Sequence, residues 1–245
     1  MVIMQIYGHR GAGGEAPENT IAGCLHAIER GAEYVEIDLR LSADDQLIII
    51  HDRSLKRTTG KQAKASNYTA RELAKTDARS DGPPWPRKKD CGVPTLEALL
   101  KATGKLKGYQ LEVKPDSKPI MKRIAQHLAD RFDTKDAARK IVVTSSNNYL
   151  HECLGDMAPH IRRGMVVMRP DAMSNLEELG CQYCALHWSA CNFFSVRQLK
   201  KAGIHVSAWT VNDAQTIRNL YKLKVDSVIT DYPSMAVPLL SALER

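Results

Sequence analysis

Apolar and polar positions along this chain follow two periods from its start. Residues 2–8 are almost wholly apolar and end at Gly8-His9, and residues 33–41 place apolar side chains at every second position; both patterns predict strands. Between them, residues 19–30 repeat apolar side chains at helical spacing and stop at Gly31, which predicts a helix. This succession of strand, helix and strand indicates a parallel βαβ unit.

The same succession continues to the end of the chain. Further strands are predicted at 108–114, 140–145, 164–168, 183–187, 204–210 and 226–230. Helices are predicted at 118–132, 147–154, 171–179, 195–202 and 213–223, with a last one after Pro233. Thr95 is placed to cap a further helix that reaches about residue 102. These segments make about eight βα units in 245 residues, which favours a single α/β domain, a (β/α)8 TIM barrel over residues 1–245.

One segment interrupts this succession after the second strand. Asp44-Asp45 predicts a turn, residues 46–50 a short returning strand and residues 69–75 a helix, whereas residues 80–92 have the proline, glycine and charge of a loop. We expect these residues to form a short insertion in the barrel. An open doubly wound sheet is the alternative fold, but no Gly-x-Gly-x-x-Gly follows the first strand.

Composition is that of an ordinary globular protein, with 43% hydrophobic and 26% charged residues. No run approaches the roughly 18 apolar residues of a membrane span. The apolar N-terminus lacks the leading basic region of a signal peptide, and six cysteines are too few for a disulfide scaffold. We therefore expect a cytoplasmic protein without stable membrane insertion.

A formal net charge of +7 can attract phosphates, nucleic acid or anionic lipid, or it can simply keep the protein in solution. Basic residues are spread along the chain, and residues 87–89 form the one dense cluster, without a basic tail. A small anionic substrate is therefore expected rather than nucleic acid. The oligomeric state stays open.

Polar side chains stand at the carboxyl end of nearly every predicted barrel strand. That end is where a TIM barrel gathers its active site. The residues are His9, Arg10, Glu36, Asp38, Glu112, Lys114, Ser145, His187, Trp209 and Asp231.

Three of these residues are acidic and lie on neighbouring predicted strands. Glu36 and Asp38 are two apart, so their side chains leave the same face of a strand. Two carboxylates facing into a barrel repel each other unless a cation or a proton lies between them, and Glu112 can add a third ligand. Such a set suits one divalent cation, Mg²⁺ or Ca²⁺, better than zinc. The alternative is a structural ion-pair network with the basic residues Arg10, Arg40 and Lys114.

Two histidines are the natural proton carriers, because imidazole titrates near neutral pH. His9 and His51 each stand at a strand end beside a charged residue. Arg10 and Lys114 supply the positive charge that a phosphate oxyanion needs. The set as a whole indicates metal-assisted phosphoryl chemistry.

A second metal-capable group bunches at Cys181, Cys184, His187 and Cys191. Zinc sites usually combine paired Cys-x-x-Cys units across a longer loop, and this spacing differs. The alternative is a buried strand that carries small apolar cysteines.

Ordered motifs span nearly the whole chain. They are His9-Arg10-Gly11, Pro17-Glu18-Asn19-Thr20, Glu36-Ile37-Asp38, His51-Asp52, Arg57-Thr58-Thr59-Gly60, Pro94-Thr95-Leu96-Glu97, Leu111-Glu112-Val113-Lys114, Ala208-Trp209-Thr210-Val211-Asn212 and Val225-Asp226-Ser227-Val228-Ile229-Thr230-Asp231. Their order and spacing resemble the glycerophosphodiester phosphodiesterase family, and the compact length is similar to its cytoplasmic bacterial branch.

The resemblance implies a TIM barrel that hydrolyses glycerophosphodiesters to sn-glycerol 3-phosphate and an alcohol with a divalent cation, in glycerophospholipid degradation. It also implies a role for each matching residue. Glu36, Asp38 and Glu112 would bind the metal, and His9 and His51 would be the acid–base pair. Arg10 and Lys114 would bind the phosphate, and Trp209 would lie against the glycerol. Glu18 and Asn19 would orient the first histidine and the surrounding ligands. For Trp209, core filling is the alternative.

Two departures from the family pattern bear on the alcohol rather than on the reaction. Ser145-Ser146-Asn147 replaces the usual Ser-Phe, and Leu186-His187-Trp188 replaces the usual His-Leu-Asn. An enzyme for lysophospholipids or sphingomyelin is the second hypothesis; it requires an apolar lip, for which the loop with Trp85 is the sequence hint. A non-catalytic phosphate-binding barrel is the third, and it predicts a lost histidine or carboxylate, which this sequence does not show.

Overall fold

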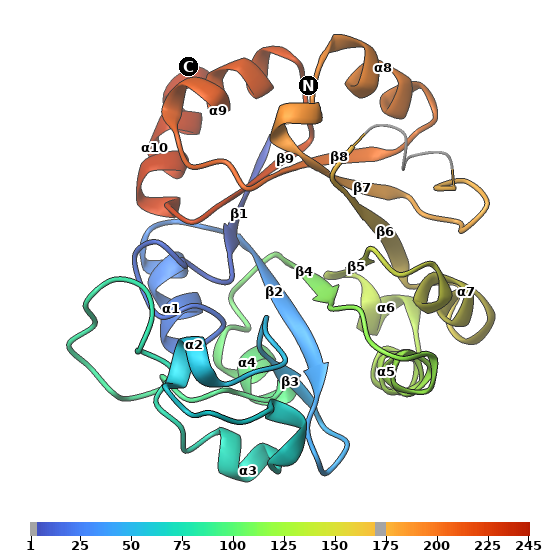
Figure 1. Ribbon diagram of the computed structural model, residues 1–245. Helices are drawn as coiled ribbons and strands as arrows, with labels where there is room; N and C mark the ends of the chain where they lie inside the picture. Colours follow the sequence, from blue (N-terminus) through green and yellow to red (C-terminus); the bar gives the residue numbers. More distant parts are fainter. Residues whose placement is uncertain (1–3, 170–174) are drawn as a thin grey trace.

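The structure is a computed structural model that describes residues 4–169 and 175–245, and eight parallel strands in it form a closed barrel (Figure 1). The barrel strands are β1 (Gln5–His9), β2 (Tyr34–Leu41), β4 (Gly108–Val113), β5 (Ile141–Ser145), β6 (Arg162–Val167), β7 (Tyr183–His187), β8 (His205–Trp209) and β9 (Ser227–Thr230). Their order is β1-β9-β8-β7-β6-β5-β4-β2, and pairing of β1 with β2 closes the ring. The predicted (β/α)8 fold class is confirmed.

Helices cover the outside of the ring. They are α1 (Ile21–Glu29), α4 (Leu96–Ala102), α5 (Lys118–Arg131), α6 (Lys135–Ala138), α7 (Asn148–Met157), α8 (Phe193–Lys201), α9 (Ala214–Lys222) and α10 (Pro233–Leu243), with a 3-10 turn η3 (Trp188–Ala190) after β7. As predicted, Thr95 caps α4, because its hydroxyl accepts a hydrogen bond from the Ala98 amide. In the described part of the chain, no helix is both long and apolar enough to cross a membrane.

One predicted helix differs from the structure. Of the helix expected at 171–179, residues 171–174 lie outside the described residues, and residues 175–180 form turns. Gly180 closes these turns with a φ of 62°, a conformation that favours glycine.

The expected insertion after β2 is present and has its own small core. It holds β3 (Leu47–Ile49), α2 (Lys56–Thr59), η1 (Ala65–Asn67) and α3 (Ala70–Leu73). β3 pairs antiparallel with β2, which confirms the predicted returning strand, and α3 is shorter than the helix expected at 69–75. Ile48, Leu55 and Leu73 are buried together under these elements.

The alternation predicted for β2 separates the two faces of the barrel wall. Val35, Ile37 and Leu39 pack with residues of the surrounding helices in one hydrophobic core. Glu36 and Asp38 point to the opposite face, into the barrel, and are also almost completely buried. Burial therefore does not distinguish the two faces of this strand, but polarity does, because the inner face carries the site.

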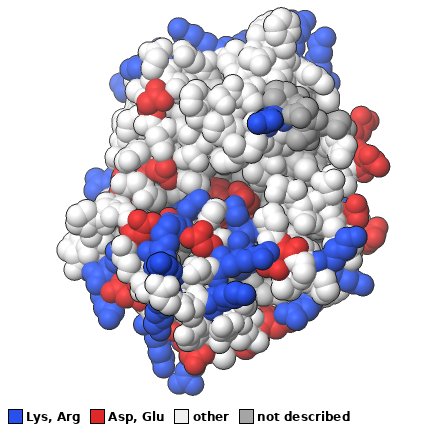
Figure 2. All heavy atoms as spheres, viewed as in Figure 1, with Lys and Arg blue, Asp and Glu red and all other residues white. Residues whose placement is uncertain are grey.

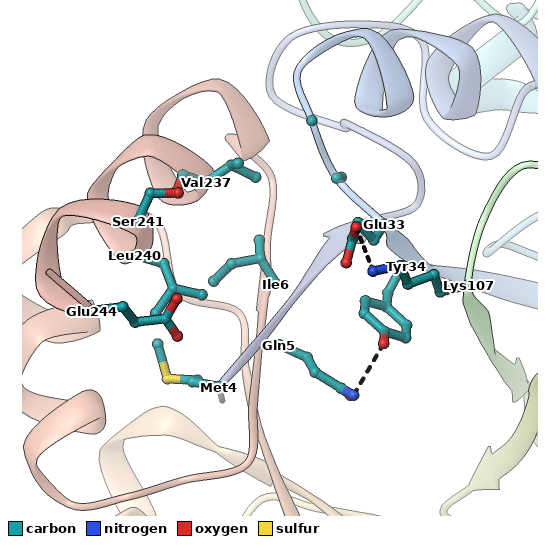
Figure 3. A pocket seen from close by; sticks show the side chains of 12 residues that line it. Met4, Gln5, Ile6, Glu33, Tyr34, Lys107, Val237, Leu240, Ser241 and Glu244 are labelled. Carbon is teal, nitrogen blue, oxygen red and sulfur yellow. Dashed lines mark hydrogen bonds and ion pairs between the residues drawn. The ribbon is translucent and has the colours of Figure 1, made fainter. Parts of the chain in front are cut away.

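A cavity of about 390 Å³ lies at the other end of the barrel, beside the amino ends of β1 and β2 (Figure 3). There the Gln5 amide donates to the Tyr34 hydroxyl over 3.2 Å, and Lys107 pairs with Glu33 at 2.7 Å. In a TIM barrel this end contributes to stability rather than catalysis. The cavity is therefore not the active site.

We predict that Gly8→Ala destabilises the barrel. A Cβ atom at residue 8 would lie 1.9 Å from the backbone carbonyl oxygen of Gly11, so the loop after β1 would have to move. Urea denaturation should show a loss of roughly 3 kcal/mol in the free energy of unfolding. Gly104→Ala is the matched control, because its Cβ atom would meet nothing closer than 3.8 Å. Equal stability of the two variants would contradict this packing argument.

Candidate active site

Three carboxylates meet at the carboxyl ends of β2 and β4. One oxygen from each of Glu36, Asp38 and Glu112 lies within 4.8 Å of the others. The parallel register places Asp38 beside Glu112, which is why residues 74 positions apart along the chain share one site. Among the residues that the structure describes, this is the one group of three or more metal-capable side chains close enough to hold an ion.

The two buried carboxylates of this group respond oppositely to their surroundings. Burial and the neighbouring Asp38 charge raise the pKa of Glu36 to about 8. Burial also acts to raise the pKa of Asp38, but Arg10, with Nε 3.3 Å away, and Lys114, with Nζ 3.5 Å away, outweigh it and lower that pKa. Asp38 thus has two basic side chains close by, whereas the one ion-pair contact of Glu36 among the described residues is with His9 at 3.8 Å.

The donor set fits a hard divalent cation. Glu36 Oε1 is buried and has no hydrogen-bond partner, so one ligand oxygen in the centre of the group is unsatisfied. Three carboxylate oxygens this close together match the preference of Mg²⁺ and Ca²⁺ for oxygen ligands. This acidic cluster can therefore bind a metal ion.

Asn19 holds Asp38 in place. Its side chain donates to Asp38 Oδ2 over 2.7 Å and accepts a hydrogen bond from the Asp38 amide over 3.1 Å. To reach both, Asn19 adopts a left-handed backbone conformation with a φ of 54°, which asparagine tolerates better than most residues. Asn19 thus orients one carboxylate of the acidic group, which is in keeping with the part of the expectation that concerned the surrounding ligands.

His9 is fixed through one ring nitrogen. Its Nδ1 lies 2.6 Å from Asp231 Oδ1, and the other oxygen of Asp231 accepts a hydrogen bond from the Asn212 amide over 2.6 Å. Burial acts to lower the pKa of His9, but the bond to Asp231 and the charge of Glu36 outweigh it and raise that pKa. His9 Nε2 lies 3.8 Å from Glu36 Oε2, so it faces the acidic group.

His51, at the end of the strand predicted over residues 46–50, is held in the same way. Its Nδ1 lies 2.7 Å from Asp52 Oδ1, and Arg57 Nε donates to the other Asp52 oxygen over 2.7 Å. A carboxylate on Nδ1 keeps a proton there and leaves Nε2 for the substrate. Each histidine ring is thus oriented by a carboxylate, and each carboxylate is held in turn by a further residue, Asn212 for Asp231 and Arg57 for Asp52.

Glu18 joins the loop after β1 to the insertion. Arg57 contacts it with two nitrogens, each at 2.7 Å, and Arg10 Nη1 adds a contact at 3.1 Å. Arg10 has a φ of 51°, an uncommon left-handed conformation that turns its side chain toward Glu18 and Asp38. The sequence shows the motif around Arg57, but the contacts of Arg57 with Glu18 and Asp52 form only when the insertion is folded.

Of the remaining strand-end residues, Trp209 and His187 contact each other, whereas Ser145 supports a neighbouring strand. Trp209 Nε1 donates to the Ala185 carbonyl over 2.8 Å, and the His187 ring contacts Trp209 edge-on at 5.4 Å. Ser145 is buried and donates to the Val113 carbonyl, so it supports β4 rather than facing a substrate. In the closed ring, β8 lies directly across from β4, which places Trp209 opposite the Lys114 side.

The cysteine group does not assemble a metal site. Cys181, Cys184, His187 and Cys191 are all described residues, yet their ligand atoms do not form a cluster close enough for an ion. Burial raises the pKa of the Cys184 thiol to about 12, which disfavours the thiolate that zinc requires. Cys184 is buried on β7 and Cys181 is buried just before it, so for these two the apolar alternative fits the structure.

An apolar lip, defined by four exposed side chains, flanks the mouth of the barrel after β6 and β7. Their exposed fractions are 58% for Met168, 42% for Trp188, 56% for Phe193 and 80% for Phe194. Trp85, the residue that suggested a lip from sequence, instead packs edge-on against His26 at 5.4 Å. In Figure 2 charged side chains crowd the half of the view that holds α1 to α5, whereas the half with β7, β8 and α8 is mostly uncharged.

Comparison with known proteins agrees with this geometry. Residues 9–235 match the glycerophosphoryl diester phosphodiesterase family. The Bacillus subtilis protein YhdW is 30% identical, over 96% of this chain and 97% of its own. The human lysophospholipase D GDPD1 is 23% identical, over 92% of this chain and 82% of its own. An Oleispira antarctica phosphodiesterase, solved with the product sn-glycerol-3-phosphate, superposes with a TM-score of 0.85 at 27% identity and covers 98% of this chain and 97% of its own.

The fold, the site and these matches together define a TIM-barrel hydrolase of phosphoric diesters. The chain belongs to the glycerophosphoryl diester phosphodiesterase family.

We predict that Mg²⁺ or Ca²⁺ stabilises the fold through the acidic group. At a concentration one hundred times its Kd, the cation should add about 2.7 kcal/mol to the stability and raise the melting temperature. Glu112→Gln should abolish most of this rise, because it removes one of the three ligands. Glu152→Gln, an exposed site on α7, is the control and should keep it. A cation response that is equal in both variants would argue against this ligand role.

Proposed function

We propose that this protein hydrolyses glycerophosphodiesters to sn-glycerol 3-phosphate and an alcohol, using one divalent cation and two histidines. The observation that carries the proposal is the meeting of three carboxylates with two carboxylate-held histidines at one end of the barrel. The product bound to the Oleispira antarctica relative supports the proposal that hydrolysis leaves the phosphate on the glycerol. Mg²⁺ and Ca²⁺ are the cations that the oxygen ligands favour.

In this proposal, basic side chains and the metal group hold the phosphate. Arg10 and Lys114 lie beside Asp38 and keep their positive charge, since the acidic neighbours raise the pKa of both against the effect of burial. They face the phosphate oxygens and offset charge that develops on them. Glu36, Asp38 and Glu112 would hold the cation, which would supply further positive charge to offset that of the phosphate.

The two histidines move the protons. Water adds its oxygen to phosphorus while the bond from phosphorus to the alcohol oxygen breaks. One histidine takes a proton from the water through Nε2, and the other gives a proton to the departing alkoxide. His9 and His51 suit both roles because Asp231 and Asp52 fix their rings through Nδ1.

We predict that His9→Ala and His51→Ala each lower kcat for glycerophosphocholine by about 10²- to 10⁴-fold, the usual share of general acid–base catalysis. Enzyme-coupled detection of glycerol 3-phosphate measures this, and a chelator should abolish release from the unaltered enzyme until cation is restored. His160→Ala is the control, because His160 bonds the Phe132 carbonyl at the far end of the barrel. Near-normal turnover by either active-site variant would rule out the proposed mechanism.

A lysophospholipase D activity is a second candidate function, and the apolar lip is the observation that favours it. His187 contacts both Trp188 and Trp209, at 5.7 and 5.4 Å between ring centroids, so the lip continues from the residue expected against glycerol. An acyl chain on that glycerol would extend over Phe193 and Phe194. The human relative named lysophospholipase D supports this candidate.

We predict that the double change Phe193→Ser and Phe194→Ser raises KM for lysophosphatidylcholine about tenfold, because apolar contact with the acyl chain is lost. Choline release measures this reaction. Glycerophosphocholine has no acyl chain and serves as the internal control, with unchanged kinetic constants. An equal effect on both substrates would mean that the lip supports the fold rather than binding a chain.

A further inference from the structure

A second hollow opens beside the catalytic group, between the insertion and α5. It has a volume of about 350 Å³, and we call it the basic groove. Its charged lining residues are Arg40, Arg53, Lys64, Lys114, Arg123 and Asp116. Five cations and one anion thus surround a space large enough for a small organic group.

Partners outside the groove neutralise two of these cations. Arg123 Nη2 lies 2.5 Å from Asp45, and Lys114 pairs with Glu112 and Asp38. Arg40 and Arg53 share Asp116 at 3.7 and 3.5 Å.

Lys64 is exposed and has no carboxylate partner in the described part of the chain. Three cations, Arg40, Arg53 and Lys64, therefore face the single acid Asp116. This leaves an excess of two positive charges in the groove.

Arg40 shows that this excess is not satisfied within the protein. Its Nη1 is buried and makes no hydrogen bond, and its contact with Asp116 is too long for one. A guanidinium with a buried, unpartnered donor beside a second guanidinium is a natural site for a phosphate group.

Two residues that line the groove, Arg40 and Lys114, also contact residues of the candidate active site. Arg40 Nε donates to the His51 carbonyl over 2.8 Å, and Lys114 lines the groove while pairing with two metal-cluster carboxylates. Trp209 lies across the barrel on β8. If glycerol lies against Trp209, the alcohol on the other side of the phosphorus extends toward the basic groove.

We propose that the basic groove selects glycerophosphodiesters whose alcohol carries a second phosphate group. A phosphomonoester has a charge of about −1.5 to −2 at neutral pH, which matches the excess of two cations. The reaction stays the same hydrolysis: the phosphorus–oxygen bond to the alcohol breaks, and the second phosphate leaves intact on that alcohol. This inference rests on the proposed function for its substrate and on the groove for its preference.

The test compares two diesters that differ by one phosphate, glycerophosphoinositol 4-phosphate and glycerophosphoinositol. The unaltered enzyme should prefer the first by about tenfold in kcat/KM at low salt, and this preference should fall at high ionic strength. Arg53→Gln and Lys64→Gln should each reduce it about threefold, and the double variant should nearly abolish it. Turnover of glycerophosphocholine should be unchanged in all of them.

Lys105→Gln is the matched control, because it removes an exposed charge at the amino end of β4, away from the groove. An unaltered enzyme without preference, or a preference that survives in the double variant, overturns the inference while the proposed function stands.

Calorimetric binding of inositol 4-phosphate separates the two claims, since it needs no turnover. If the protein hydrolyses no glycerophosphodiester, the inference still holds provided that the unaltered protein binds inositol 4-phosphate and the double variant does not. Equal binding by the double variant and the unaltered protein overturns the inference.

Discussion

Repulsion between Glu36 and Asp38 is the constraint on which the site depends. Both carboxylates face into the barrel two residues apart on β2, and both are almost completely buried. An unpaired buried charge is costly, so each needs a partner or a proton. Asp38 has Arg10, Lys114 and Asn19 around it, whereas Glu36 keeps an unsatisfied oxygen and a raised pKa. The asymmetry makes Glu36 the carboxylate with most to gain from a bound cation.

The outer charges are arranged around this pair. Arg10 contacts Asp38 and Glu18, and Glu18 in turn contacts Arg57, which orients Asp52 against His51. Each link is a charge-assisted contact, so the position of His51 is tied to the acidic group through the insertion. The insertion thus contributes residues to the candidate active site, although its own small core folds beside the barrel.

The sequence predicted the parts of this site that depend on strand periodicity. Glu36 and Asp38 could be placed on one face because side chains alternate along a strand, and Glu112 could be placed beside them because consecutive parallel strands are neighbours. The roles of Arg57 and Asp231 could not be predicted in the same way. Arg57 acts from an irregular segment, and Asp231 meets His9 across the closure of the ring, 222 residues away. The exposed apolar side chains lie after β6 and β7, whereas Trp85 packs against the distant His26, and such packing cannot be read from sequence spacing.

The mouth of the barrel has two chemically different sides, and this difference follows from which elements form them. The side with the insertion and α5 carries the cations of the basic groove, because the end of β2, the insertion and α5 present long basic side chains there. The side after β6 and β7 presents Met168, Trp188, Phe193 and Phe194. A diester held between His9 and His51 has two different ends, and a mouth that is apolar on one side and basic on the other distinguishes them. Under the proposed function, the glycerol end then lies against Trp209 and the alcohol end against Arg40, so the fold fixes the direction in which the substrate binds.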